Sequence, residues 1–118
     1  MLKLTVYIPE PALEKVKAAL FEAGAGRSGL YDRCCWLVKG EGQFRPLPGS
    51  EPAIGKIGET AHVDEYKLET LLPAELAADV EAAIRRAHPY EEPAYDFIEL
   101  YQVRNDDAKA TLPASTAQ

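Results

Sequence analysis

The sequence contains few of the residues that most often carry chemistry. Its 118 residues include only two histidines, two cysteines, one tryptophan and one methionine. Cys34 and Cys35 are adjacent, and successive side chains of a strand point to opposite faces. A disulfide between them would therefore need unusual backbone geometry. We expect reduced thiols, a reducing compartment and a cytoplasmic protein.

Long hydrophobic runs and an excess of basic residues are also missing. No apolar run approaches the ~20 residues that span a bilayer, and residues 1–7 lack the apolar stretch of a signal peptide. The 19 acidic residues outnumber the 13 basic ones, which gives a net charge of −6. Nucleic acids and anionic membranes both attract basic surfaces. The composition therefore argues against a nucleic-acid partner and against a membrane.

Catalytic and nucleotide-binding motifs are absent as well. The glycines at positions 40 and 42 do not precede a predicted helix, so they are not a dinucleotide fingerprint, and no phosphate loop exists. No serine lies in a nucleophile elbow. No neighbouring base is available to activate Cys34 or Cys35. We predict that the protein is not an enzyme.

What the sequence does contain is a clear alternation of strand and helix patterns. Hydrophobic residues make up 47% of the chain, enough for the core of one domain. Apolar periodicity predicts four strands, over residues 2–8, 31–39, 62–72 and 94–103. Helical spacing predicts two helices, over residues 12–23 and 73–87.

This βαββαβ order predicts an α+β fold, a ferredoxin-like sandwich in which an antiparallel sheet carries two helices on one face. We expect a single domain over residues 1–104. Residues 105–118 are small and polar, so we expect a flexible C-terminal tail there.

The most distinctive segment, residues 88–96, reads HPYEEPAYD and joins the second helix to the last strand. It combines an imidazole with carboxylates, the ligand types that bind zinc and other divalent ions. A candidate metal site consists of His88, Glu91 and Glu92, with His62 from the third strand. A divalent metal ion is thus the cofactor to consider.

A structural role explains the same segment equally well. Pro89 and Pro93 would make a rigid turn, and His88 would be favoured at the C-terminal end of a helix by the helix dipole. No linear metal-binding motif is present.

A second candidate site lies in the glycine- and proline-rich segment that follows the second strand. Arg45 and Lys56, with glycines on either side, would offer cations and backbone N–H groups to an anion. The alternative, which we favour, is that these glycines shape a bulged hairpin.

The motifs, taken in order, resemble one known family. Residues 29–36 read GLYDRCCW, the segment from Gly40 to Gly58 repeats glycine and proline at set positions, and residues 88–96 read HPYEEPAYD. Over residues 1–104 this combination resembles the inserted, YqfO-type domain of the Nif-three-like (NGG-interacting-factor) family, here as a stand-alone protein. The resemblance implies a CutA- and PII-like ferredoxin fold and a tendency to form trimers. It implies no catalytic residues.

Three functions follow as hypotheses. The preferred one is a homo-oligomeric module that binds or senses a small ligand or a metal, as a trimer or else a dimer, with protein partners unspecified. The second is a divalent metal-binding protein of metal homeostasis that uses His88, Glu91, Glu92 and His62. The third, less favoured, is a metal-dependent hydrolase.

Overall fold

The computed structural model describes residues 1–103, and its elements follow the predicted βαββαβ order. The elements are β1 (Leu2–Pro9), α1 (Leu13–Glu22), β2 (Trp36–Phe44), β3 (Ala61–Leu72), α2 (Ala77–Ala87) and β4 (Tyr95–Glu99). Among the described residues, no helix reaches the length and hydrophobicity needed to cross a membrane.

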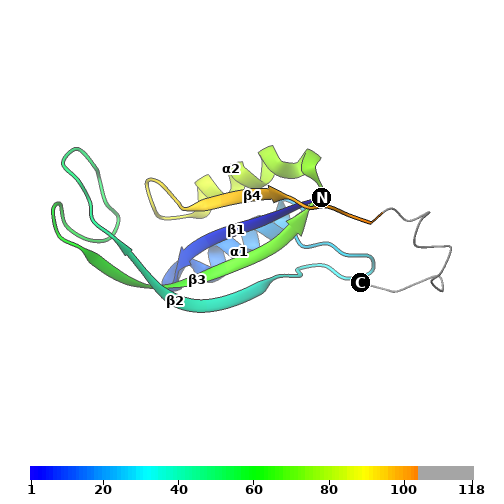
Figure 1. Cartoon of the computed structure of the whole chain (residues 1–118), viewed down its shortest axis with the longest axis horizontal. Coiled ribbons are helices and arrows are strands. Elements are labelled where there is room, and N and C mark those ends of the chain that lie inside the picture. Colours follow the sequence, from blue (N-terminus) through cyan, green and yellow to red (C-terminus); the bar gives the residue numbers. More distant parts are fainter. Residues whose placement is uncertain (104–118) are drawn as a thin grey trace.

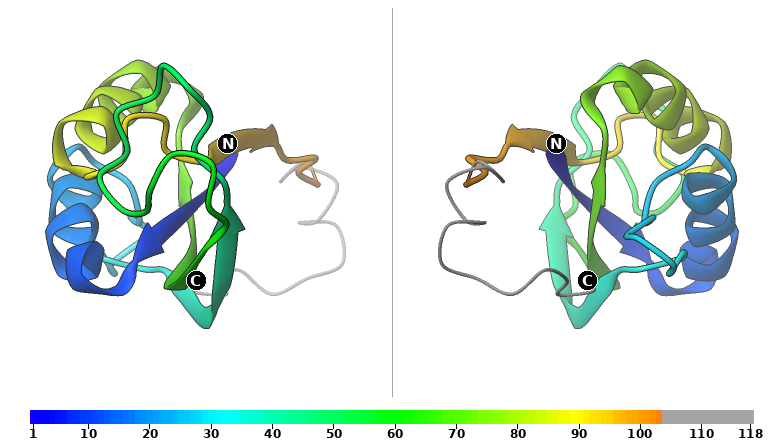
Figure 2. Two further views of the ribbon diagram at one scale, coloured as in Figure 1. Left: turned by 90° about the vertical axis from the view of Figure 1, so that its left-hand side faces the viewer. Right: turned by 90° about the vertical axis from the view of Figure 1, so that its right-hand side faces the viewer.

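The strands form one antiparallel sheet in the order β2-β3-β1-β4 (Figure 1). Both helices cover the same face of this sheet, and the other face carries no helix (Figure 2). The predicted ferredoxin-like α+β fold is therefore confirmed.

The core lies between the sheet and the two helices. Leu4, Val6 and Ile8 alternate along β1 and are completely buried. They meet apolar side chains that recur at helical spacing on α1 and α2, namely Val16, Leu20, Val80, Ile84 and Ala87. Burying such side chains contributes about 1.5–3 kcal/mol each, so the helices are held mainly by this interface.

Each helix starts in the same way. Pro9, the last residue of β1, and Pro73, which follows β3, are both extended, with ψ angles of 142° and 144°. Each precedes a single 3₁₀ turn, Glu10–Ala12 or Ala74–Leu76. Proline has a fixed φ and no N–H to satisfy, which suits the start of a helical segment. The predicted helix starts at 12 and 73 therefore fall close to the observed turns.

The open face of the sheet carries several exposed apolar side chains. Its strand positions point away from the helices and include five large side chains that are 38–68% exposed: Tyr7, Trp36, Val38, Leu71 and Ile98. Charged residues of β3, namely Glu65, Lys67 and Glu69, alternate among them.

The β2–β3 hairpin extends beyond the rest of the sheet. Residues 41–44 of β2 pair with residues 61–64 of β3 past the point where β1 ends (Figure 1). Residues 45–60 then form an irregular loop at its end. This extension contributes no residue to the hydrophobic core.

Several sequence-based boundaries need correction. The second strand begins at Trp36, not Tyr31, because the backbone N–H of Cys34 instead donates to Gly26 at 2.8 Å, which holds this part of the chain in a loop. Pairing from Trp36 to Phe44 is continuous, so the hairpin carries no bulge. The last strand is shorter, Tyr95–Glu99. The predicted tail, 105–118, lies outside the described residues.

Candidate functional site

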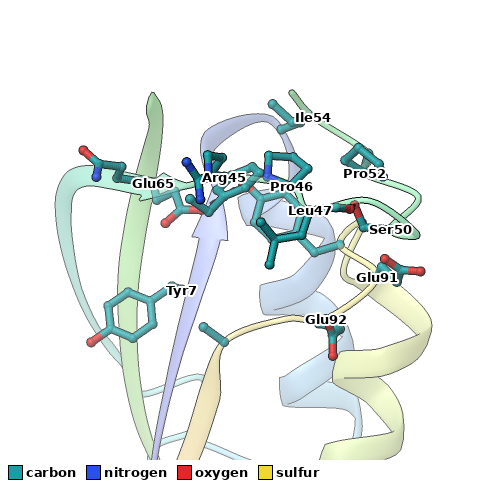
Figure 3. Close-up of a pocket in the computed structure, with 15 residues that line it drawn as sticks. Tyr7, Arg45, Pro46, Leu47, Ser50, Pro52, Ile54, Glu65, Glu91 and Glu92 are labelled. Carbon is teal, nitrogen blue, oxygen red and sulfur yellow. Dashed lines mark hydrogen bonds between the residues drawn. The ribbon is translucent and has the colours of Figure 1, made fainter. Parts of the chain in front are cut away.

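A pocket of about 410 Å³ lies where the end of β2 and the following loop meet the connection between α2 and β4 (Figure 3). Its volume is in the range of small-molecule sites, about 300–1,000 Å³. Most of the lining residues are apolar or aromatic, and four charged side chains lie among them. The lining residues are Tyr7, Gln43, Phe44, Arg45, Pro46, Leu47, Ser50, Pro52, Ala53, Ile54, Glu65, Tyr90, Glu91, Glu92 and Ala94.

His88 supports the pocket from behind. Its side chain is buried, with only 6% exposed. The ring Nε2–H donates to the Tyr7 carbonyl at 2.8 Å, and Nδ1 accepts the Tyr90 N–H at 3.1 Å. These two bonds require the neutral Nε2–H tautomer, and burial lowers the pKa of His88 below its ordinary value. The imidazole therefore ties the 88–94 connection to β1.

Tyr90 forms the adjoining wall. Its hydroxyl donates to Glu65 Oε2 at 2.9 Å, and its ring packs edge-on against Phe44 with ring centroids 5.7 Å apart. Burial and the Glu65 carboxylate raise the pKa of Tyr90 well above its ordinary range. Tyr90 thus joins the 88–94 connection to both strands of the hairpin.

Gly42 explains how Glu65 can occupy this position. A Cβ atom at Gly42 would collide with the Glu65 carboxylate. The absence of a side chain there lets the carboxylate lie over β2, within reach of the Tyr90 hydroxyl.

A single polar contact fastens the hairpin loop to the far side of the pocket. The Glu51 N–H donates to Glu91 Oε1 at 3.2 Å. Both residues are exposed, so this contact adds little stability. It does place the 45–60 loop over the pocket.

The predicted anion site is only partly assembled. Arg45 lines the pocket, whereas Lys56 is not among its lining residues and lies in an exposed turn of the 45–60 loop. The two cations therefore do not share the pocket.

The predicted metal ligands are separated as well. Glu91 and Glu92 line the pocket, whereas both nitrogens of His88 already have backbone partners. His62 lies on the hairpin, where Nδ1 is 3.3 Å from Glu41 Oε2. Over residues 1–103, no group of three or more histidine, cysteine, aspartate or glutamate side chains is placed to hold a metal ion.

The sequence analysis did not select Phe44 or Glu65 as site residues, and it did not predict the role of Tyr90. Phe44 and Tyr90 lie within the two motifs that carried the family resemblance, and this was a usable signal. Glu65 looks like any charged residue on the exposed face of a strand. Only the register of β3 against β2 places it near Gly42 and Tyr90.

The thiols lie away from this pocket. Cys34 and Cys35 are free and partly buried. Cys35 lines a second hollow beside α1, and burial raises the pKa of its thiol. A raised pKa disfavours the reactive thiolate.

Comparison with known proteins identifies close relatives of this chain. It is 49% identical over 98 residues to a GTP cyclohydrolase 1 type 2 homolog of Mycobacterium tuberculosis, covering 83% of the chain and 26% of that protein. It is 45% identical over 110 residues to the Bacillus subtilis protein of the same name, covering 93% of the chain and 29% of that protein. The chain thus spans between a quarter and a third of the length of these relatives. No protein-family model matches it.

Solved structures agree with the sequence relatives. A Bacillus cereus protein related to NIF3 superposes with a TM-score of 0.74 at 39% identity, over 86% of this chain and 26% of that one. CutA1 from Pyrococcus horikoshii superposes with a TM-score of 0.62 at 20% identity, over 92% of both chains, which shows a shared fold. Over 83–93% of its length the chain is therefore similar to one part of these longer NIF3-related proteins, and it shares the fold of CutA1.

Proposed function

We propose that the protein is a non-catalytic module that binds a small ligand in the pocket between the β2–β3 hairpin and the 88–94 connection, and that it works as a homo-oligomer. The observation that carries this proposal is the pocket itself. Its walls come from two segments that are held together by few contacts. A ligand that filled the pocket would bridge them and fix the hairpin, which suits a sensor.

Two features favour binding over catalysis. The imidazole of His88 faces backbone partners on both nitrogens. Ser50, which lines the pocket, donates its hydroxyl to the Leu47 carbonyl at 2.7 Å. Neither His88 nor Ser50 is hydrogen-bonded in the way that links a catalytic base to its nucleophile. The activity named in the longer relatives concerns proteins of which this chain spans less than a third, so we do not extend it to this chain.

The apolar open face of the sheet supports the oligomer. Large exposed apolar patches on soluble domains commonly mark interaction sites. The five exposed side chains lie on all four strands, so they spread across the face that is available to another copy of the chain. The family resemblance favours a trimer.

Native mass spectrometry of the purified chain tests both parts of the proposal. We expect an oligomer, with retained small-molecule mass or a mass shift when candidate ligands, including GTP, are added. Ala53→Trp would fill the pocket from an exposed loop position and should abolish the adduct. Ala82→Trp, on the exposed side of α2, is the matched control and should retain it. A ligand that binds Ala53→Trp unchanged would place binding elsewhere.

A further inference from the structure

The pocket has an unbalanced charge that points to the chemistry of its ligand. Its ionised side chains are Arg45 on one hand and Glu65, Glu91 and Glu92 on the other. One positive and three negative charges leave a net charge of −2 within the lining. Because Lys56 is not among the lining residues, it does not correct this balance.

The carboxylates lie at two sides of an apolar floor. Arg45 and Glu65 lie on the strand side, and Glu91 and Glu92 lie on the side of the 88–94 connection (Figure 3). Pro46 lies between them and is buried. A ligand that crosses this space would therefore have an apolar body and a polar group at its end.

The carboxylates differ in how free they are to bind. Glu65 already accepts the Tyr90 hydroxyl at 2.9 Å, and Glu91 accepts the Glu51 N–H through Oε1. Glu92 accepts no hydrogen bond from another side chain or from the backbone of the described residues. It is therefore the carboxylate best able to accept a charged hydrogen bond from a ligand.

The aromatic wall favours a cation as well. Phe44 and Tyr90 pack edge to face at the pocket. The Tyr90 hydroxyl donates to a carboxylate, which increases the electron density of the phenol ring. Aromatic rings attract ammonium and guanidinium groups that approach their faces.

We propose that the pocket selects an organic cation, an amine or guanidinium carried on an apolar body, with Glu92 as the main charge partner. This inference rests on the proposed function, because it names the ligand class of the same pocket. It differs from the anion site expected from Arg45 and Lys56, since three carboxylates now outweigh the one guanidinium.

A pair of probes of opposite charge tests the proposal. 2-Phenylethylamine and phenylacetate are similar in size and carry the same ring. Titration of each into the isotopically labelled full chain, followed by amide NMR, reports which residues respond. For compounds of about ten heavy atoms we expect a dissociation constant of ~1–10 mM for the amine. Phenylacetate should bind at least about tenfold more weakly, and added salt should weaken the binding of the amine.

Matched variants separate charge from structure. Glu92→Gln should weaken the amine about three- to tenfold. Glu75→Gln removes the same charge in the 3₁₀ turn before α2, at the opposite end of the helix from the 88–94 connection, and should leave the affinity for the amine unchanged. Arg45→Gln should strengthen amine binding.

Each outcome decides one of the two proposals. Amine-dependent shifts at Ala53, Tyr90 and Ala94 that weaken in Glu92→Gln support a cation site. If phenylacetate binds at these residues as tightly as the amine, the proposal of a cation site is wrong, but the pocket remains a ligand site. If neither probe shifts these residues at 20-fold the expected dissociation constant, the cation proposal fails, and the adduct experiment with Ala53→Trp decides the proposed function separately.

Discussion

Gly26 controls the path of the chain between the first helix and the second strand. Its φ of +84° favours glycine, and a Cβ atom would lie 2.9 Å from the Cys34 carbonyl oxygen. Its N–H donates to Leu71 and its carbonyl accepts the Cys34 N–H, both at 2.8 Å. One residue therefore fastens the 25–35 loop to the sheet.

Replacing Gly26 by alanine should destabilise the protein strongly. Strain at the positive φ and the contact with Cys34 should together lower the free energy of unfolding by about 2–3 kcal/mol. Urea denaturation measures this change. Gly40→Ala is the control, because Gly40 has no atoms near the added Cβ and no positive φ, and should change stability by less than about 1 kcal/mol. Equal losses in both variants would contradict this role of Gly26.

His88 should make stability depend on pH. Burial lowers its pKa below the ordinary 6.5, although the bond to Tyr7 and the charge of Glu65 act in the opposite direction. Tyr90 donates its N–H to Nδ1 and carries the hydroxyl that faces Glu65. The unfolded chain therefore takes up this proton at higher pH than the folded protein does. The stability from neutral His88 is complete above pH 6.5 and is lost as the pH falls toward the native pKa.

The variant His88→Gln isolates this effect. It should be less stable than the wild type near pH 7.5, and the difference should shrink between about pH 6.5 and pH 5. Urea denaturation across this range measures the difference. His62→Gln, on the exposed hairpin, controls for the loss of an imidazole outside the buried connection. A difference that stays constant with pH would show that His88 acts through packing alone.

At the scale of elements, the extended hairpin is separable from the core. Core residues of β2 and β3 begin at Leu37 and Leu68, which pair with each other. Glu41 pairs with Asp64 further out. The hairpin residues beyond this pair line the pocket but contribute nothing to the hydrophobic core.

A shortened hairpin should therefore fold without the pocket. Replacing residues 42–63 by Asn-Gly would join Glu41 to Asp64 with a two-residue turn that suits the twist of paired strands. We expect the free energy of unfolding to change by less than about 2 kcal/mol, because no core side chain is removed. Circular dichroism and urea denaturation measure the fold. Loss of cooperative unfolding would show that the extension is part of the folding unit.

The sequence predicts the elements well where local pattern and burial agree. Leu4, Val6 and Ile8 alternate as the strand period requires, and all three are buried. The predicted start of β2 was wrong because Cys34 and Cys35 extend an apolar run that is typical of a strand. Their backbone is instead engaged by distant groups, such as the Thr70 hydroxyl that donates to the Cys34 carbonyl at 2.7 Å.

The candidate site was predictable only in part, for a similar reason. Arg45, Glu91 and Glu92 were selected as candidates and all three line the pocket. Which residues join them depends on strand register and on how the hairpin lies over the connection. Lys56 and Glu65 are both charged residues in or beside the hairpin, and nothing local to either one shows that only Glu65 reaches the pocket.

At the scale of the whole molecule, the helices cover one face of the sheet and leave the other open (Figure 2), and the open face carries exposed apolar side chains. Ile98 is 55% exposed on β4 and Val38 is 51% exposed on β2, at opposite edges of the sheet. A second copy packed on this surface would cover both. Their removal from water would contribute about 25 cal/mol per Å² of apolar area.

Lysine at either position should dissociate the proposed oligomer. Ile98→Lys or Val38→Lys would bury an unpaired charge between copies, which is costly, so the association constant should fall about tenfold or more. Native mass spectrometry and light scattering report subunit number, and circular dichroism confirms folding. Ala82→Lys, on the exposed side of α2, should leave assembly intact. Because neither substituted side chain belongs to the core, oligomers that persist in both variants would place the contact between copies on another surface.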